Sequence, residues 1–176
     1  MTFPVPPQAR QALDALHGAG FEAYLVGGCV RDSLRGTQPH DWDIATSALP
    51  GQTAAVFSGL PLCRAGEKHG TVTVCFPGLP VEITTFRLDG QYQDHRRPQS
   101  VAFSRSLRED LARRDFTINA MAWDGGLADP FGGRADLAAG LVRCVGDPQK
   151  RLEEDSLRIL RGVRFAAGLG FRLGKG

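Results

Sequence analysis

Lysine is scarce in this sequence, and its four cysteines lie far apart. Lysine occurs only at Lys68, Lys150 and Lys175, so arginine supplies most of the 21 Lys and Arg residues. No two cysteines form a CxxC pair, which argues against the usual zinc and thiol-redox spacings. The formal net charge of +2 is too small to indicate nucleic-acid binding by itself.

Long hydrophobic runs are also missing. No segment is apolar over the length that a membrane-spanning helix needs, and the N-terminus lacks the basic segment and apolar core of a signal peptide. We therefore expect a cytoplasmic protein with no membrane association. The 176 residues, of which 42% are hydrophobic, suffice for one ordinary domain or for one domain and the start of another.

Apolar periodicity and turn residues predict a chain of alternating short elements. The residues favour helices at 9–17, from 27 to about 36, after 50, from 106 and over 148–168, strands at 21–26, 41–45, 71–76 and 81–86, and a long polar loop at 87–103. This order predicts an α+β fold in which a small mixed sheet with flanking helices precedes a helical region.

The run GGCVRD at residues 27–32 lies between a predicted strand and a predicted helix. Glycines at such a turn let backbone N–H groups approach phosphates, and the helix N-terminus favours negative charge there. Gly27, Gly28 and Arg31 are therefore candidate ligands of a triphosphate. On its own, a Gly-Gly pair is more often simply a turn.

Asp41 and Asp43 flank one residue of the next predicted strand, so both carboxylates should face the same side. Such a pair repels itself unless a cation lies between, and Mg²⁺ commonly uses one or two carboxylates plus substrate phosphates. Glu82 is a candidate third carboxylate that ligates metal or accepts a proton, although a strand glutamate can simply face solvent. The order strand, Gly-Gly, helix, DxD favours nucleotidyl transfer to a hydroxyl with release of pyrophosphate.

Four runs of the sequence, in this order, resemble the class II tRNA nucleotidyltransferase and bacterial poly(A) polymerase family: LVGGCVRD at 25–32, DWDIAT at 41–46, RRDFTINA at 113–120 and EDSLRILR at 154–161. The resemblance covers nearly the whole chain. It implies a polymerase-β-like head at 1–140 and the start of an all-helical neck at 141–176, and the family's body and tail are absent from this sequence. Family members extend RNA 3′ ends without a template.

The third of these runs has a ribose-binding role in the family. Carried over to this sequence, the resemblance gives that role to Arg114, Asp115 and Asn119. Asp115 can accept a hydrogen bond from a 2′-hydroxyl, and Asn119 can both donate and accept. The alternative is a helix start capped by Asp115 with its neighbouring arginines in solvent.

Asp155 and Arg158 lie three residues apart in the predicted helix 148–168, so we expect them to share a face. Asp155 can accept from an exocyclic amine while Arg158 donates to a ring nitrogen or carbonyl, which matches cytosine and adenine and rejects uracil and guanine. The resemblance implies this base-reading role; the alternative is an ordinary surface ion pair. Arg161 and Arg164 follow at helical spacing as further nucleotide or phosphate contacts.

The segment 87–101 resembles the family's flexible loop, which accompanies addition of the terminal A and argues against an enzyme that adds only C. We therefore expect a Mg²⁺-dependent tRNA nucleotidyltransferase that uses CTP and ATP on the tRNA 3′ end. A-only addition or poly(A) synthesis is one alternative. An inactive nucleotide-binding or RNA-processing module is another.

Overall fold

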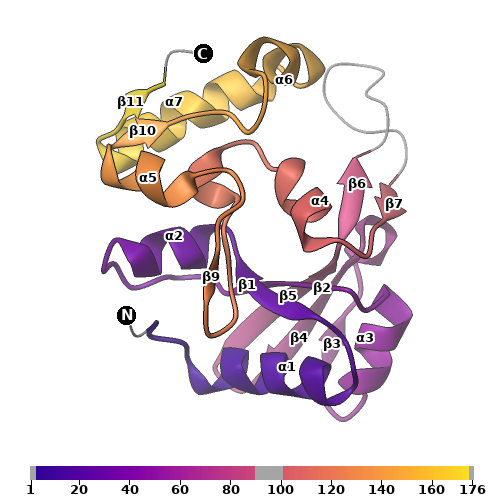
Figure 1. The fold of residues 1–176 in the computed structure, drawn as a ribbon. Helices are drawn as coiled ribbons and strands as arrows, with labels where there is room; N and C mark the ends of the chain where they lie inside the picture. The colour runs from indigo at the N-terminus through magenta and orange to yellow at the C-terminus, as the bar shows by residue number, and fades with distance from the viewer. Residues whose placement is uncertain (1–2, 90–100, 175–176) are drawn as a thin grey trace.

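A seven-stranded mixed sheet forms the centre of the computed structural model, which describes residues 3–89 and 101–174 (Figure 1). Its spatial order is β3-β4-β5-β2-β1-β8-β9, and neighbours are antiparallel except for the parallel pair β2 and β5. The strands are β1 Ala23–Val26, β2 Asp43–Thr46, β3 Leu62–Cys63, β4 Thr71–Phe76, β5 Leu79–Thr85, β8 Ala122–Trp123 and β9 Leu127–Ala128. The predicted mixed sheet is confirmed.

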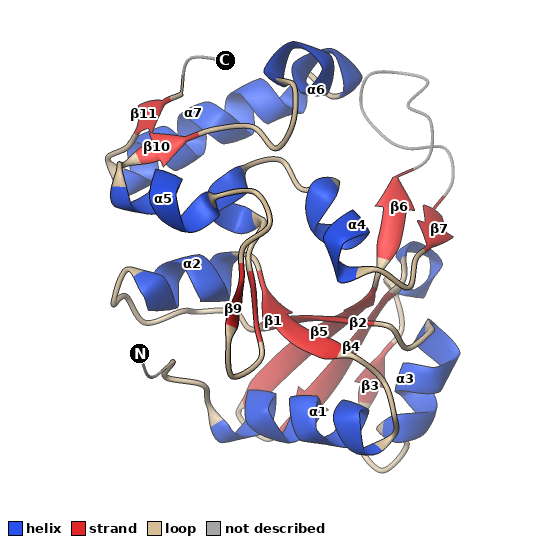
Figure 2. Ribbon diagram, in the orientation of Figure 1, coloured by secondary structure: helices blue, strands red, loops and turns tan. Residues whose placement is uncertain are grey.

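Helices α1 (Pro7–Gly18) and α3 (Pro50–Val56) cover one face of this sheet (Figure 2). The alternating apolar residues of β4 and β5 point into this layer, where they pack with the apolar side of α1. The cluster includes Leu13, Leu16, Ile44, Val74 and Ile83, all fully or almost fully buried. Because side chains alternate along a strand, the residues between them, among them Asp43 and Glu82, face the opposite side.

Among the residues that the structure describes, the second face of the sheet is covered only in part. Helix α4 (Leu107–Ala112) packs there through Leu111 against Ala45 and Phe86, while the short helix α2 (Gly28–Leu34) follows directly from β1. The tight turn at Gly78, with a φ of 79°, joins β4 to β5 as the sequence predicted.

The C-terminal third packs as a separate small layer above the sheet (Figure 1). Its core gathers Phe116, Ile118 and Val142 with the partly buried Phe165 and Phe171. The elements of this layer are η2 Thr117–Asn119, α5 Gly133–Ala138, β10 Leu141–Val142, α6 Pro148–Glu154, α7 Leu157–Leu169 and β11 Arg172–Leu173. Outside this layer, the short 3-10 turn η1 (Glu67–His69) lies between β3 and β4. Strands β10 and β11 form a small parallel pair, so this region is mainly but not wholly helical.

The predicted helix over 148–168 is wrong in one respect, because the chain breaks between α6 and α7. Asp155 is extended, with φ −146° and ψ 101°, and its Oδ1 accepts a hydrogen bond from Leu157 N at 3.0 Å. Such a local side-chain bond to the backbone competes with the helix. Gly162 lies inside α7 as expected, but it serves packing: a Cβ there would stand 3.2 Å from the Phe116 ring.

The predicted loop 87–103 is also partly structured. Its ends form the antiparallel pair β6 (Arg87–Asp89) and β7 (Val101–Phe103), which packs beside α4, while residues 90–100 lie outside the described part of the chain. Within residues 3–89 and 101–174, no helix is long and apolar enough to cross a bilayer.

Candidate functional site

Asp43 and Glu82 are direct neighbours across the parallel strands β2 and β5. Asp41 lies two residues before Asp43, exposed and just outside β2, so the predicted strand begins later than expected. Burial, then the charge of Glu82, raises the pKa of Asp43 to about 6; Arg114 opposes this rise and Asp41 adds to it. The charges of Glu82 and Asp41 thus both act on Asp43, while the metal-binding and catalytic roles of the three carboxylates stay a prediction.

This donor set fits a divalent cation that takes its remaining ligands from elsewhere. Among the described residues, no group of three or more His, Cys, Asp and Glu side chains is close enough to hold a metal ion by itself. Magnesium commonly binds through one or two carboxylates together with substrate phosphates and water. The half-buried Asp43, whose charged form is disfavoured beside Glu82 and Asp41, is a position where a cation would relieve repulsion.

The turn at Gly27 depends on glycine for two reasons. Its φ is 76°, which side chains rarely adopt, and a Cβ there would lie 3.1 Å from Arg114 Nη1. Gly28, the first residue of α2, would accommodate a side chain, since an added Cβ would lie at an ordinary contact distance of 3.7 Å from Arg31 Nη2. The structure therefore places the backbone of Gly27 directly against Arg114, an arginine from the run at 113–120.

Arg31 joins two of the predicted motifs. Its guanidinium donates to both carboxylate oxygens of Asp32 at 2.8 and 2.9 Å and to Asn119 Oδ1 at 2.7 Å. It also lies 5.4 Å from the centre of the Phe165 ring on α7. Arg31 thus connects the turn after β1, the ribose-binding candidate Asn119 and the C-terminal layer.

Asp110 positions the arginines of this site, and the sequence-based prediction missed it. Its carboxylate, 1% exposed, accepts from Arg113 Nε at 3.1 Å, Arg114 Nη2 at 3.1 Å and Arg87 N at 3.2 Å. The available signal was the i,i+3 and i,i+4 spacing from Asp110, on α4, to Arg113 and Arg114, which directly follow the helix. Arg114 Nε is buried and finds no hydrogen-bond partner among the described residues.

The ribose and base candidates form one ion-pair network. Asp115 accepts from Arg158 Nε at 2.7 Å and lies 2.7 Å from Arg161 Nε, while Arg161 Nη2 donates to Asp155 at 2.6 Å. Arg158 is 2% exposed and also donates to the carbonyl of Arg151 at 2.6 Å. Partial burial lowers the pKa of Arg161, but its bonds to Asp155 and Asp115 outweigh this and raise the pKa above its ordinary value.

One geometric expectation for this network was wrong. Asp155 lies before α7 and not on it, so it and Arg158 do not share a helix face. Arg164 is exposed, stacks on the Phe165 ring at 5.4 Å and makes no bond to the network within the described chain, so its contact with nucleotide or phosphate stays a prediction. Arg151 was not predicted, yet it donates to the carbonyls of Arg113 and Arg114 at 2.6 and 3.0 Å and so ties α6 to the ribose run.

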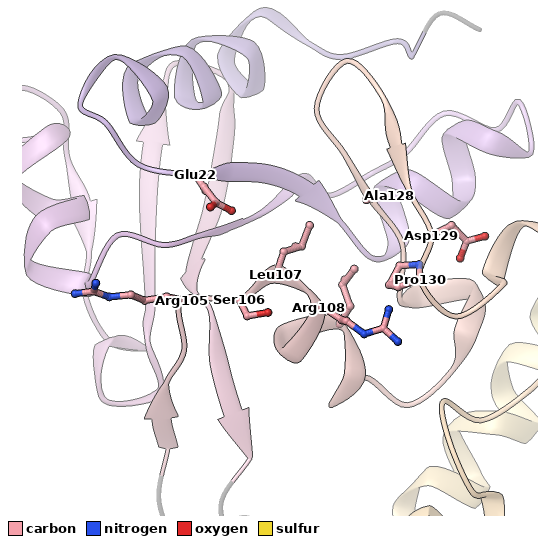
Figure 3. A pocket seen from close by; sticks show the side chains of 9 residues that line it. Glu22, Arg105, Ser106, Leu107, Arg108, Ala128, Asp129 and Pro130 are labelled. Atoms are coloured by element: carbon pink, nitrogen blue, oxygen red, sulfur yellow. The ribbon is translucent and has the colours of Figure 1, made fainter.

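A separate hollow of about 660 Å³ opens at the other end of β1 (Figure 3). None of the predicted site residues lines it. Its lining residues are Glu22, Arg105, Ser106, Leu107, Arg108, Leu111, Ala128, Asp129 and Pro130. In the close-up, Arg105 points away from Arg108, so the two cations do not converge on one point (Figure 3).

Comparison with known proteins agrees with this geometry. The model of the poly(A) polymerase head domain family matches residues 23–143. The CCA-adding enzymes of Geobacillus thermodenitrificans and Limosilactobacillus fermentum are each 52% identical to the chain, over 172 and 170 residues, covering 96% of it. The chain spans 42% of the length of each, about two fifths of these relatives.

Solved structures give the same assignment. The CCA-adding enzyme of Bacillus stearothermophilus in complex with CTP superposes with a TM-score of 0.86 at 45% identity, over 97% of this chain and 42% of that one. The Thermotoga maritima CCA-adding enzyme complexed with tRNA gives 0.76 at 30% identity, over 97% and 40%. The relatives' family is one of generally metal-dependent nucleotidyltransferases. The four ordered motifs, the carboxylates on the sheet and the head-domain match show that this chain belongs to the poly(A) polymerase head domain family.

Proposed function

We propose that this chain is the catalytic head and the start of the neck of a template-independent nucleotidyltransferase that adds C and A to the tRNA 3′ end. The observation that carries the proposal is the cross-strand pair Asp43 and Glu82, with Asp41 nearby and the Gly27 turn beside it. The similarity to proteins named as CCA-adding enzymes supports the proposal. We assign the head to residues 1–140 and the start of the neck to 141–176.

In the proposed reaction the 3′-oxygen of the RNA forms a bond to the α-phosphorus of CTP or ATP, and the bond from that phosphorus to pyrophosphate breaks. Glu82, exposed beside Asp43, accepts the proton of the attacking hydroxyl. Asp41 and Asp43 would hold Mg²⁺, which when bound neutralises charge on the phosphates.

The triphosphate and the ribose lie on the β1 side of the carboxylates in this proposal. The N–H of Gly27 donates to the Met121 carbonyl at 3.3 Å, so the turn offers the backbone N–H of Gly28 at the start of α2, and Arg31 and Arg114 offer positive charge. Arg31 already bonds to Asn119, so a bound nucleotide meets both groups in one place. A hydroxyl of the ribose can replace the Arg31 guanidinium as the donor to the Asn119 amide oxygen.

Base selection follows from the network of Asp155 and Arg158. In the structure Asp155 accepts from Arg161 and Arg158 donates to Asp115. A cytosine or adenine that bonds to Asp155 and Arg158 competes with these intramolecular ion pairs, so nucleotide binding reorganises the network. Arg161, released in part from Asp155, becomes available to phosphate, and the exposed Arg164 adds positive charge nearby.

The compartment proposed for this reaction is the cytoplasm. All four cysteines carry free thiols, and burial raises the pKa of Cys29 to about 11, which makes that thiol unreactive. Unpaired cysteines are typical of proteins from a reducing compartment. tRNA maturation by nucleotide addition is consistent with that location.

Calorimetric titration of the 176-residue chain with CTP, ATP, UTP and GTP, with and without Mg²⁺, tests the proposal. We expect Mg²⁺-dependent binding of CTP and ATP that is about tenfold or more tighter than that of UTP and GTP, since a wrong base leaves buried polar groups unpaired. Asp43→Asn should abolish the Mg²⁺ dependence, whereas Asp14→Asn, an exposed position on α1 with the same charge change, should not.

The remaining outcomes separate the alternatives. Binding of ATP without CTP would favour A-only addition or poly(A) synthesis. Equal binding of all four nucleotides would refute the base-reading assignment of Asp155 and Arg158. An absence of nucleotide binding by a chain shown to be folded by circular dichroism would overturn the proposed function.

A further inference from the structure

Strand register aligns four side chains in one row on the incompletely covered face of the sheet. Cys63 on β3 pairs with Thr73 on β4, Thr73 with Glu82 on β5, and Glu82 with Asp43 on β2. Directly opposed residues point to the same face, and neighbouring strands lie about 4.8 Å apart, so the row runs about 14 Å from Asp43 to the sheet edge. Glu82 and Cys63 are exposed and Thr73 is half-buried.

The two sides of Asp43 are chemically different. The arginines and the glycine turn assigned to phosphate, Gly27, Arg31 and Arg114, all belong to the β1 side. In phosphoryl transfer the attacking and leaving oxygens lie roughly in line on opposite sides of the phosphorus. If pyrophosphate leaves towards Gly27, the hydroxyl must arrive from the opposite side, over β5 and β4.

Counted outward from the carboxylates, Thr73 is the next side chain after Glu82 along the path of the incoming hydroxyl. The neighbouring hydroxyl on the same face, Thr71, is bonded to Thr84 at 2.9 Å. The Thr73 hydroxyl has no side-chain hydrogen bond within residues 3–89 and 101–174, so it can donate to a phosphate or ribose oxygen. Past the edge, exposed Arg64 and Lys68 supply positive charge, although Arg64 also pairs with Glu67 at 2.6 Å.

We propose that the row from Glu82 to Cys63 is the acceptor subsite, where the terminal nucleotide of the RNA lies with its ribose or phosphate bonded to the Thr73 hydroxyl. The inference rests on the proposed function, because it requires nucleotide on the β1 side. Thr73 is then a substrate-positioning residue: it holds the nucleotide whose 3′-hydroxyl meets Glu82, and it takes no part in proton transfer.

Disulfide tethering tests this placement on the chain itself. The probe is a short RNA ending in CC whose terminal 2′ position carries a disulfide-linked tether, mixed with protein and excess 2-mercaptoethanol. Cys63 thiolate attacks the tether disulfide, forms a new S–S bond to the RNA arm and expels the outer thiol. A Cys75→Ser background leaves Cys63 as the one fully exposed cysteine of the described chain, because Cys29 is buried and Cys144 is half-buried.

The matched controls come from the same molecule. The first control, in the Cys75→Ser background, combines Cys63→Ser with Gln11→Cys. Its thiol then lies at an exposed position of α1, on the opposite side of the sheet. This variant should capture the RNA probe only at the background level of any free thiol. Thr73→Val, which removes one hydrogen bond at nearly constant shape, should lower RNA capture at Cys63 about fivefold. Thr73→Ser should restore capture, and Thr71→Val, whose hydroxyl is already used, should leave capture unchanged.

Two results would overturn the inference. Equal capture at Cys63 and at Gln11→Cys would show that RNA does not lie along the row. Equal capture by the Thr73→Val and Thr73→Ser variants would remove Thr73 from the subsite. The Mg²⁺-dependent CTP titration of the unchanged chain is run in parallel: normal CTP binding without selective capture refutes the acceptor subsite alone, whereas loss of CTP binding refutes the proposed function on which it rests.

Discussion

Replacement of Asp43 by asparagine is expected to stabilise the metal-free protein at neutral pH. The Asp43 pKa rises from its ordinary value of 3.8 to about 6, first because of burial and then because of Glu82. Each pKa unit corresponds to about 1.4 kcal/mol, so the charged carboxylate costs the folded state on the order of 3 kcal/mol. Asparagine keeps the shape and removes that cost.

The sign of this effect gives it a characteristic pH dependence. Between about pH 4 and pH 6 the folded protein binds more protons at Asp43 than the unfolded chain does, so the free energy of unfolding falls as pH rises. Above about pH 6 this decrease in the free energy of unfolding is complete, and below about pH 4 there is no decrease. The advantage of Asp43→Asn should therefore be absent near pH 3.5 and reach about 1–3 kcal/mol at pH 7.5.

Urea unfolding of both proteins in EDTA across this pH range measures the difference directly. For a chain of this size, each kcal/mol also raises the melting temperature by about 2–4 °C, which thermal unfolding can detect. Asp14→Asn on α1 controls for the change in net charge. If the Asp43→Asn variant is no more stable than the wild-type protein at pH 7.5, burial and the neighbouring carboxylates do not disfavour the charge of Asp43, and the proposed cation site loses its electrostatic basis.

Two glycine substitutions, each with a control substitution at another glycine, test the geometry around the site. Gly27→Ala combines a φ of 76° with a Cβ 3.1 Å from a neighbouring arginine, whereas Gly36→Ala has a φ of 72° and open space. Both should lose about 1–3 kcal/mol in urea unfolding, and only Gly27→Ala should also weaken CTP binding; equal CTP affinities would contradict a phosphate-binding turn. Gly133→Ala drives a Cβ into the backbone carbonyl oxygen of Thr117 and should cost about 3 kcal/mol or more, while Gly126→Ala, in open space, serves as its control. A Gly133→Ala protein as stable as the control would show that the turn after β9 can move freely.

Local sequence signals predicted much of the sheet. The alternation of apolar residues in β4 and β5, the Pro77-Gly78 turn between them and the Gly27-Gly28 turn after β1 are short-range patterns, and each gave the observed element. Their boundaries shifted by a few residues, as at Asp41, because strand ends depend on pairing with a neighbour. Backbone preferences of adjacent residues suffice for such elements.

The break between α6 and α7 shows where local signals failed. The apolar spacing of the last third predicts one helix, but Asp155 bonds to Leu157 N and to Arg161, and Arg158 reaches back across the break to the Arg151 carbonyl at 2.6 Å. Charged hydrogen bonds of this kind outweigh the small propensity gain of continuing a helix through two residues.

The sequence by itself determined the chemistry: which residues are acidic, basic or glycine, and in what order they occur. Only the tertiary structure decided which of them meet. Parallel pairing of β2 with β5 brings Asp43 beside Glu82, and the packing of the C-terminal layer brings Arg31 to Asn119 and Arg158 to Asp115. The reason is physical, since ion pairs and strand registers between distant segments depend on how the buried core folds the chain back, and no local pattern records that.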